Sequence, residues 1–416
     1  MHLGRYSFGI GDRFGRQGRA QLAALIEAKR QGVDIVPVWN KSNREHGIIG
    51  TKPADVRNEA DAAVQAAGWG GAYFVDADHI GLDNVEAFIE TSDFFTIDVA
   101  EFTGKRARSA DIDSFVEGWR GLVGSHRIDG IREPVELDES RLRDIAGTYL
   151  AAVRQAGEIF RHVEARKGPG RFITEVSMDE TDAPQTPVEL LVILAAIADE
   201  GIPAETIAPK FSGRFNKGVD YRGDAAQFAV EFERDLAVIR FAVERFPLPH
   251  TLKLSIHSGS DKFSIYGAIA AGIRRFDAGL HVKTAGTTWL EELIGLALAG
   301  GDGLGIARDV YGQSLARIDE LCGPYATVID IDRRKLPTVA EVGKWTGEEF
   351  AAALRHDPAC PIYNPNLRQL LHVGYRVAAE LGPRFLAALD RYEPTIAENV
   401  TANLYERHIH PLFLVG

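Results

Sequence analysis

Residues 251–262 read TLKLSIHSGSDK, and this stretch decides the fold class of the 416-residue chain. Its first half alternates apolar residues with Lys253, Ser255 and His257. A period of two predicts a strand with one apolar face and one polar face. The small polar residues that follow leave the backbone free to turn and to approach a ligand. A strand, then a polar loop, then a helix is typical of the active-site edge of a parallel α/β barrel.

Strands and helices alternate on both sides of this stretch. Helical composition is found at 19–29, 53–67, 187–200, 224–246 and 264–273. Eight strands are predicted, at 6–11, 33–39, 72–77, 94–99, 172–176, 206–209, 251–256 and 276–282. This alternation favours a parallel sheet, and eight strands predict closure into a (β/α)8 barrel of the TIM type. A doubly wound open sheet is the alternative.

The rest of the chain is predicted to be mainly helical. The barrel domain is expected to span residues 1–300, with a helical insertion at about 110–168 that exceeds an ordinary crossover connection. Residues 301–416 are expected to form a helical extension that packs on the barrel.

The amino-acid composition argues against two classes of partner, nucleic acid and membranes. With a net charge of -12, the chain is not expected to bind nucleic acid or an anionic membrane surface, because both attract clustered Lys and Arg. No apolar run approaches the roughly 20 residues that span a bilayer, and the N-terminus lacks the order of a signal peptide, so a cytoplasmic protein is expected. Cys322 and Cys360 are far apart and show no metal-binding spacing. A homo-oligomer is compatible with this composition.

Polar residues collect at the carboxyl ends of the predicted strands, the edge where barrel enzymes place their active sites. Imidazole and carboxylate groups together suit a divalent Zn, Mn, Ni or Co ion. The predicted ligands are His79, Glu175, His257 and His281. The alternative for each histidine is a hydrogen-bonded group on a polar rim. No local metal signature such as HExxH supports the assignment, so it depends on the strand register.

Two further groups of residues at this edge suggest catalysis and substrate binding. Paired carboxyls can split their pKa values for acid and base work, and lysines can stabilise an oxyanion. The predicted catalytic residues are Asp76, Asp78, Glu175, Lys210 and Lys283. The predicted substrate-binding residues are Asp12, Arg13, Asn40, Ser258, Asp261 and Lys262. The glycines at 9–11 and 299–305 lack the full dinucleotide fingerprint, so NAD is not expected.

Seven segments of the chain resemble a known family. They are GIGDRFG at 9–15, VPVWNKSNREH at 36–46, FVDADHIGLDNV at 74–85, FITEVSMDET at 172–181, APKFSGRFNKGVDY at 208–221, LSIHSGSDKFSIY at 254–266 and HVKTAGTTWLE at 281–291. They are similar to the tagaturonate epimerase family, bacterial enzymes that interconvert D-tagaturonate and D-fructuronate in hexuronate catabolism. The resemblance implies a metal-dependent cytoplasmic barrel enzyme that acts on a keto-hexuronate.

The implied reaction inverts a hydroxyl-bearing carbon two positions from a ketone. Its hydrogen is not alpha to the carbonyl, so enolisation cannot invert it. Retro-aldol cleavage with re-addition to the other face is the favoured route, and stepwise migration of the carbonyl is the alternative. Asp76, Asp78 or Glu175 would remove the hydroxyl proton. Lys210 or Lys283 would stabilise the oxyanion, and Arg13 or Lys262 would hold the substrate carboxylate.

Two other functions fit the same residues. One is a metal-dependent aldolase or ketose isomerase acting on a related sugar or sugar acid. The other, from a different class, is a non-catalytic barrel that binds a sugar acid. The clustering of acid, base and ligand types favours an enzyme.

Overall fold

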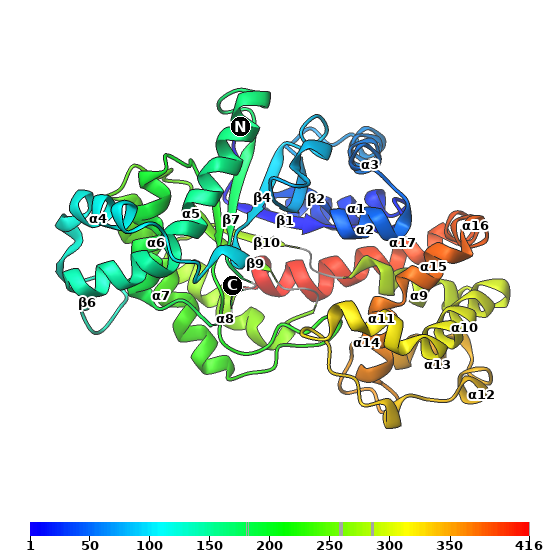
Figure 1. Cartoon of the computed structure of the whole chain (residues 1–416). Helices are drawn as coiled ribbons and strands as arrows, with labels where there is room; N and C mark the ends of the chain where they lie inside the picture. The colour runs from blue at the N-terminus through cyan, green and yellow to red at the C-terminus, as the bar shows by residue number, and fades with distance from the viewer. Residues whose placement is uncertain (180, 182, 258–260, 284–286, 416) are drawn as a thin grey trace.

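The computed structural model describes residues 1–415 apart from 180, 182, 258–260 and 284–286. Eight parallel strands close into a barrel in the order β1-β10-β9-β8-β7-β4-β3-β2, which confirms the predicted (β/α)8 fold (Figure 1). The strands are β1 (Tyr6–Ile10), β2 (Ile35–Ser42), β3 (Phe74–Ile80), β4 (Phe94–Asp98), β7 (Ile173–Ser177), β8 (Thr206–Ala208), β9 (Lys253–His257) and β10 (Leu280–Lys283).

The barrel helices pack around the outside of these strands. They are α1 (Gly18–Arg30), α3 (Pro53–Ala67), α5 (Glu139–Lys167), α6 (Pro187–Asp199), α7 (Ala225–Val243) and α8 (Phe263–Arg275). Local sequence fixes where α6 begins, because Thr186 and Glu189 form a reciprocal capping box around Pro187 in the first turn. Nine consecutive residues of α6 are buried, as expected of a helix with almost no polar face.

The alternation seen in residues 251–262 separates two environments. Leu254 and Ile256 belong to the core between strands and helices, whereas the polar residues of β9 alternate with them and face the barrel interior. A small apolar cluster that includes Phe74, Phe94 and Ile173 fills the lower barrel. The polar side chains of the barrel interior therefore lie above this apolar cluster.

The region between β4 and β7 differs from the predicted insertion at about 110–168. It contains α4 (Ser109–Gly118) and a small antiparallel sheet of β5 (Gly124–His126) and β6 (Val135–Leu137). The long helix α5 packs against α6, so it is the crossover helix of the barrel itself. The added segment is thus shorter than predicted and only partly helical. Between β3 and β4, by contrast, the connection holds only a short 3-10 turn, Val85–Ala87.

The C-terminal region is helical as expected, but its end belongs to the barrel. After α9 (Thr288–Leu298) come α10 (Gly301–Ala316), α11 (Ile318–Cys322), α12 (Val339–Val342), α13 (Gly347–Leu354), α14 (Pro365–Val373), α15 (Tyr375–Leu381), α16 (Pro383–Arg391) and α17 (Glu393–Ala402). The last helical segment, Asn403–Leu414, packs against both α1 and α8. Because β1 and β10 are neighbours, this segment fills the position of the eighth barrel helix (Figure 1).

Among the described residues, helices long enough to cross a bilayer are too polar to do so. The short α2 (Asn43–Ile49) follows β2 at the upper edge of the barrel.

Candidate active site

A buried lysine lies at the centre of the polar barrel interior. The ammonium of Lys283 is 2.9 Å from Asp76 Oδ2, 2.9 Å from Asp78 Oδ1 and 3.5 Å from Glu175 Oε1. It also donates to the hydroxyl of Thr96, which lies 3.0 Å from Asp76 and 3.2 Å from Glu175. Strands β3, β4, β7 and β10 therefore each contribute one or more members to a single network.

This crowding moves the pKa values of the carboxyls in opposite directions. Burial opposes ionisation of Asp78, but Lys283 and His79 together outweigh it and hold the pKa of Asp78 well below its ordinary value. Burial and the nearby carboxylates Asp78 and Glu175 instead raise the pKa of Asp76 to about 6. Despite burial, the three carboxylates raise the pKa of Lys283, which stays charged. Asp76 is thus the carboxyl that titrates closest to neutrality.

A distortion of β3 brings two consecutive side chains to this site. The register with β4 shifts between Ala77 and Ile80, and His79 has a φ of 54°, a left-handed conformation unusual for a residue other than glycine. In a regular strand Asp78 and His79 would face opposite sides. Here His79 Nδ1 lies 2.6 Å from Asp78 Oδ1. Backbone strain of this kind is often found at functional sites.

His79, Asp179 and His257 present ligand atoms that lie within 4.8 Å of one another. Asp179 Oδ2 is 3.1 Å from His257 Nδ1, and Asp179 Oδ1 is 3.9 Å from His79 Nε2. Burial opposes protonation of His257, but Asp179 and Glu175 outweigh it and raise its pKa to about 9. Two imidazoles and a carboxylate are a donor set that Zn, Mn, Co or Ni accepts.

Carboxylates behind the two imidazoles support this geometry. Glu175 Oε1 lies 2.8 Å from His257 Nε2, and Asp78 holds His79 Nδ1 in the same manner. The remaining nitrogen of each ring faces Asp179, and His257 Nδ1 is buried without a hydrogen bond to the described residues. A carboxylate that fixes the far nitrogen of an imidazole is the usual arrangement around metal-binding histidines. The residues present therefore fit a divalent ion.

Asp179 was not predicted from the sequence. It lies two residues beyond the end of β7, where the Ser177 hydroxyl donates to its Oδ1 at 2.6 Å. Its position just past a barrel strand was a usable signal, since that edge carries the active site in this fold. Strand alternation predicts Glu175 as an interior residue of β7 but does not extend to Asp179, which lies beyond the strand.

The structure does not place two of the predicted metal ligands with the others. Glu175 is fully buried, and its second oxygen accepts from the Thr206 hydroxyl at 2.7 Å, so it supports His257 from behind. His281 lies two residues before Lys283, deeper in the barrel. Its Nδ1 is 2.9 Å from the Ser7 hydroxyl, and burial lowers its pKa to about 3.

The first two strands place their predicted residues around the rim of the barrel. Asp12 accepts hydrogen bonds from the backbone N–H groups of three residues in the loop before α1. The guanidinium of Arg13 lies 3.1 Å from Glu45 and 4.4 Å from the ring centre of Tyr375. Asn40 is buried and pairs in register with Asp76.

Lys210 stands apart from the network. Its backbone N–H donates to the Gln185 side chain, and its amine makes no hydrogen bond or ion pair within the described part of the chain.

The predicted substrate-binding residues that follow β9 are Ser258, Asp261 and Lys262. Ser258 falls outside the described residues. Asp261 is fully buried and lies 2.6 Å from Arg368 and 3.0 Å from His356. Lys262 is also fully buried, and its ammonium donates to the carbonyls of Asn216 and Val219. Contrary to prediction, these two charged residues are structural, because protein groups already surround them.

Comparisons with known proteins identify the family of this chain. The model of the tagaturonate epimerase family matches residues 1–408. A tagaturonate/fructuronate epimerase of Thermotoga maritima is 30% identical over 421 residues, covering 97% of this chain and 80% of that protein.

Solved structures show the same fold. A glycerol-complexed fructuronate-tagaturonate epimerase from Cohnella laeviribosi superposes with a TM-score of 0.81 at 22% identity, covering 99% of this chain and 82% of that chain. Its native form gives a TM-score of 0.78 at 23% identity with the same coverage. The match of the family model over nearly the whole length, together with the relative from T. maritima, shows that this chain belongs to the tagaturonate epimerase family, a family of carbohydrate epimerases.

Proposed function

We propose that this epimerase interconverts D-tagaturonate and D-fructuronate with the help of a divalent ion held by His79, Asp179 and His257. The observation that carries the proposal is the pair of carboxylate-oriented imidazoles on either side of Asp179. Family membership and the tagaturonate/fructuronate epimerase of T. maritima support the choice of substrates.

The proposed chemistry is a retro-aldol cleavage followed by re-addition. A base takes the proton of the epimerising hydroxyl, and the C–O bond at that carbon becomes a carbonyl. The electron pair of the bond toward the ketone shifts to give an enediolate. After the new aldehyde turns its other face, the enediolate carbon attacks it, the carbon–carbon bond re-forms and the proton returns. Atoms and electrons balance without an organic cofactor, and NAD is not part of the proposal.

Among the three carboxyls proposed as the base, we assign the role to Asp76. Its pKa of about 6 lies close to the value that a general base needs near neutral pH. Asp78 is a weaker base because its pKa is depressed, and Glu175 is engaged behind His257. The charged Lys283, 2.9 Å from Asp76, would stabilise the developing oxyanion.

The bound ion would act as a Lewis acid at the ketone and its adjacent hydroxyl. Asp78 and Glu175 would keep both imidazoles in the tautomer that leaves a lone pair for the ion. At the rim, the guanidinium of Arg13 is suited to the substrate carboxylate, because a planar guanidinium can donate two parallel hydrogen bonds to the two carboxylate oxygens. We place the enzyme in the cytoplasm, as its family resemblance implies.

The test is elemental analysis of the purified protein combined with an assay of D-tagaturonate conversion. Activity should fall on chelation and return with Zn, Mn, Ni or Co. Asp179→Ala should lose both bound metal and activity. Asp98→Asn is a matched control, because Asp98 ends β4 at the same edge and its side chain bonds, among the described residues, only the backbone N–H of Ala100. Full activity in metal-free protein, or unchanged metal content in Asp179→Ala, would refute the assignment.

The same conversion assay distinguishes an epimerase from the alternative, an aldolase. Three-carbon products that accumulate in solution would indicate an aldolase, whereas an epimerase re-forms the bond before they leave. Tightly bound NAD in active enzyme would instead indicate transient oxidation.

A further inference from the structure

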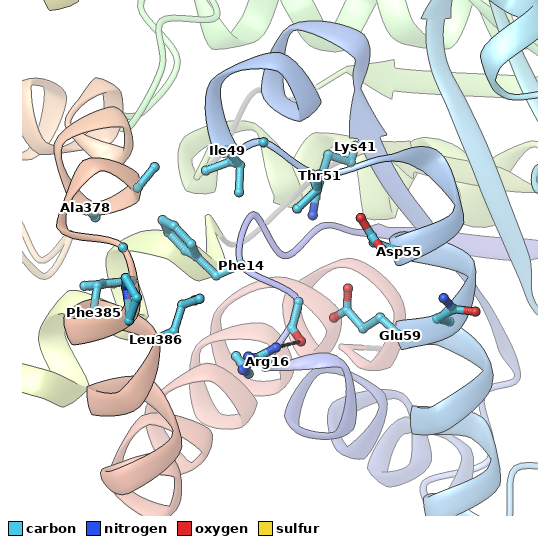
Figure 2. A pocket seen from close by; sticks show the side chains of 16 residues that line it. Phe14, Arg16, Lys41, Ile49, Thr51, Asp55, Glu59, Ala378, Phe385 and Leu386 are labelled. Atoms are coloured by element: carbon cyan, nitrogen blue, oxygen red, sulfur yellow. Dashed lines mark hydrogen bonds between the residues drawn. The ribbon is translucent and has the colours of Figure 1, made fainter.

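A cavity of about 560 Å³ lies between the barrel and the C-terminal helices. Figure 2 shows Lys41 and Glu59 on the barrel side, with Phe14, Phe385 and Leu386 facing them. Its lining comes from the β1–α1 loop, the end of β2, α3, and α15 with α16. A volume of this size lies within the range of about 300–1,000 Å³ that small-molecule sites occupy.

This cavity is separate from the network around Lys283. Val38 contacts the apolar cluster inside the barrel, whereas Trp39 belongs to the core outside it. Strand alternation then places Asn40 inside with Asp76, and Lys41 outside with Trp39. The wall of strand β2 thus stands between the two sites.

Lys41 gives the cavity an incompletely satisfied cation. Its side chain is 3% exposed, and its ammonium donates to the carbonyl of Arg13 at 2.9 Å. It forms no ion pair with the described residues. An ammonium has three hydrogens to donate, and a buried charge without a counter-charge is costly. The remaining hydrogens of Lys41 therefore suit an anionic group.

Glu59 adds a neutral partner for hydroxyl groups. Its Oε1 is buried and has no hydrogen-bond partner within the described structure. Burial and the nearby Asp12 carboxylate raise the pKa of Glu59 well above its ordinary value, which favours its protonated form. A protonated carboxyl can both donate and accept, as recognition of a hydroxyl requires.

The opposite wall is apolar and aromatic. The rings of Phe14 and Phe385 have centroids 4.8 Å apart, and Leu386 lines the same side. Such a surface accepts the C–H face of a short carbon chain while the polar groups opposite bind its substituents.

We propose that this cavity is a second small-molecule site, which binds a hydroxylated organic carboxylate. The carboxylate accepts from Lys41, a hydroxyl exchanges hydrogen bonds with Glu59, and the carbon chain lies against Phe14 and Phe385. Because the walls belong to both the barrel and the C-terminal helices, the ligand joins the two regions. This inference does not depend on the reaction catalysed in the barrel.

The test is calorimetric titration of the full-length protein with D-gluconate as the probe. Wild-type protein should show saturable binding at the cavity. Lys41→Met should weaken it at least about tenfold, because a hydrogen bond to a charged group is lost. Ala379→Phe, which fills the cavity from α15, should abolish it. Ala387→Phe is the matched control, since Ala387 is exposed on α16 and does not line the cavity.

Three results would overturn the proposal. One is the absence of saturable binding by wild-type protein. Another is binding that survives both Lys41→Met and Ala379→Phe but disappears in Asp179→Ala, which would place the probe in the barrel. The third is equal affinity for inorganic phosphate, which would mean that the site selects an anion alone. Crystals of wild-type protein soaked in D-gluconate test the site without a variant. The proposal requires the probe to lie against Lys41, and a probe bound elsewhere would contradict it.

Discussion

Replacing Lys283 with methionine is the sharpest test of the buried network. The substitution keeps the length of the side chain but leaves Asp76, Asp78 and Glu175 without their shared cation. Removing one partner of a buried ion pair typically costs about 3–5 kcal/mol. Unfolding entropy of about 2.1 cal/mol/K per residue gives roughly 0.9 kcal/mol/K for 416 residues. We therefore expect the Tm of metal-free protein to fall by about 3–6 °C at pH 8.

The loss should depend on pH, and the sign follows from proton binding. Without Lys283, the three carboxyls repel one another and have folded-state pKa values above those of the unfolded chain. The folded variant then binds more protons than the unfolded variant, so its stability falls as the pH rises. In the wild type, Asp78 and Glu175 have depressed pKa values, so their contribution is present above the unfolded values and is lost on acidification. The difference in Tm between the two proteins should thus shrink from pH 8 to pH 5.

Lys253→Met is the matched control, at the opposite end of the same barrel. Lys253 is equally buried, but it donates to the backbone carbonyl of Gly4, and burial lowers its pKa to about 8. It is charged in both folded and unfolded states from pH 5 to pH 7, so its loss should cost the same across that range. Thermal melting of both variants at a series of pH values decides the matter. If the loss of Tm in Lys283→Met is as constant between pH 5 and pH 7 as that of the control, the network is refuted.

Three other predictions concern single carboxyls. Glu175→Gln should weaken metal binding about 10–100-fold in competition with a chromophoric chelator, because His257 loses the group that orients it; unchanged affinity would argue against that role. Wild-type turnover should decline as the pH falls below about 6, where Asp76 takes up a proton, and Asp76→Asn should lose about 10²–10⁴-fold in rate together with this acidic limb. If Asp76→Asn keeps the limb, another group is the base. Burial and the charge of Glu231 raise the pKa of Asp235 well above its ordinary value, so wild-type stability falls as the pH rises above about 4. Asp235→Asn should therefore have a larger free energy of unfolding than the wild type at pH 7 in denaturant titrations, and the gain should vanish near pH 4, where both states of the wild type bind the proton.

The sequence was most informative where one period of hydrophobicity governs a whole element. The predicted strand at 94–99 and the predicted helix at 53–67 agree with β4 and α3 to within a residue, because burial of one face leaves little freedom in register. The same alternation placed Asp76, Asp78 and Lys283 on the interior face, where the structure finds them.

The depth of a side chain in the barrel and the local distortion of a strand could not be predicted from this alternation. Alternation assigns His281 and Lys283 to one face, but it does not say that the first lies a full layer lower beside Ser7. The bulge that turns His79 inward breaks the period on which the prediction rests. Asp179 lies beyond its strand, where side-chain direction depends on tertiary contacts such as that with Ser177. Long-range packing also decides that Asn403–Leu414 belongs to the barrel.

That last helical segment has a consequence for synthesis. β1 and α1 are synthesised long before Asn403–Leu414, the segment that packs against α1 and α8. Just before that segment, at the end of α17, the Thr401 hydroxyl donates to the carbonyl of Ala20 across 381 residues. Contacts between such distant parts of a chain close slowly, and apolar surface stays exposed while they wait. The nascent barrel must therefore carry an open seam between α1 and α8 until Asn403–Leu414 has been synthesised. A truncation before Asn403 would leave that seam open permanently.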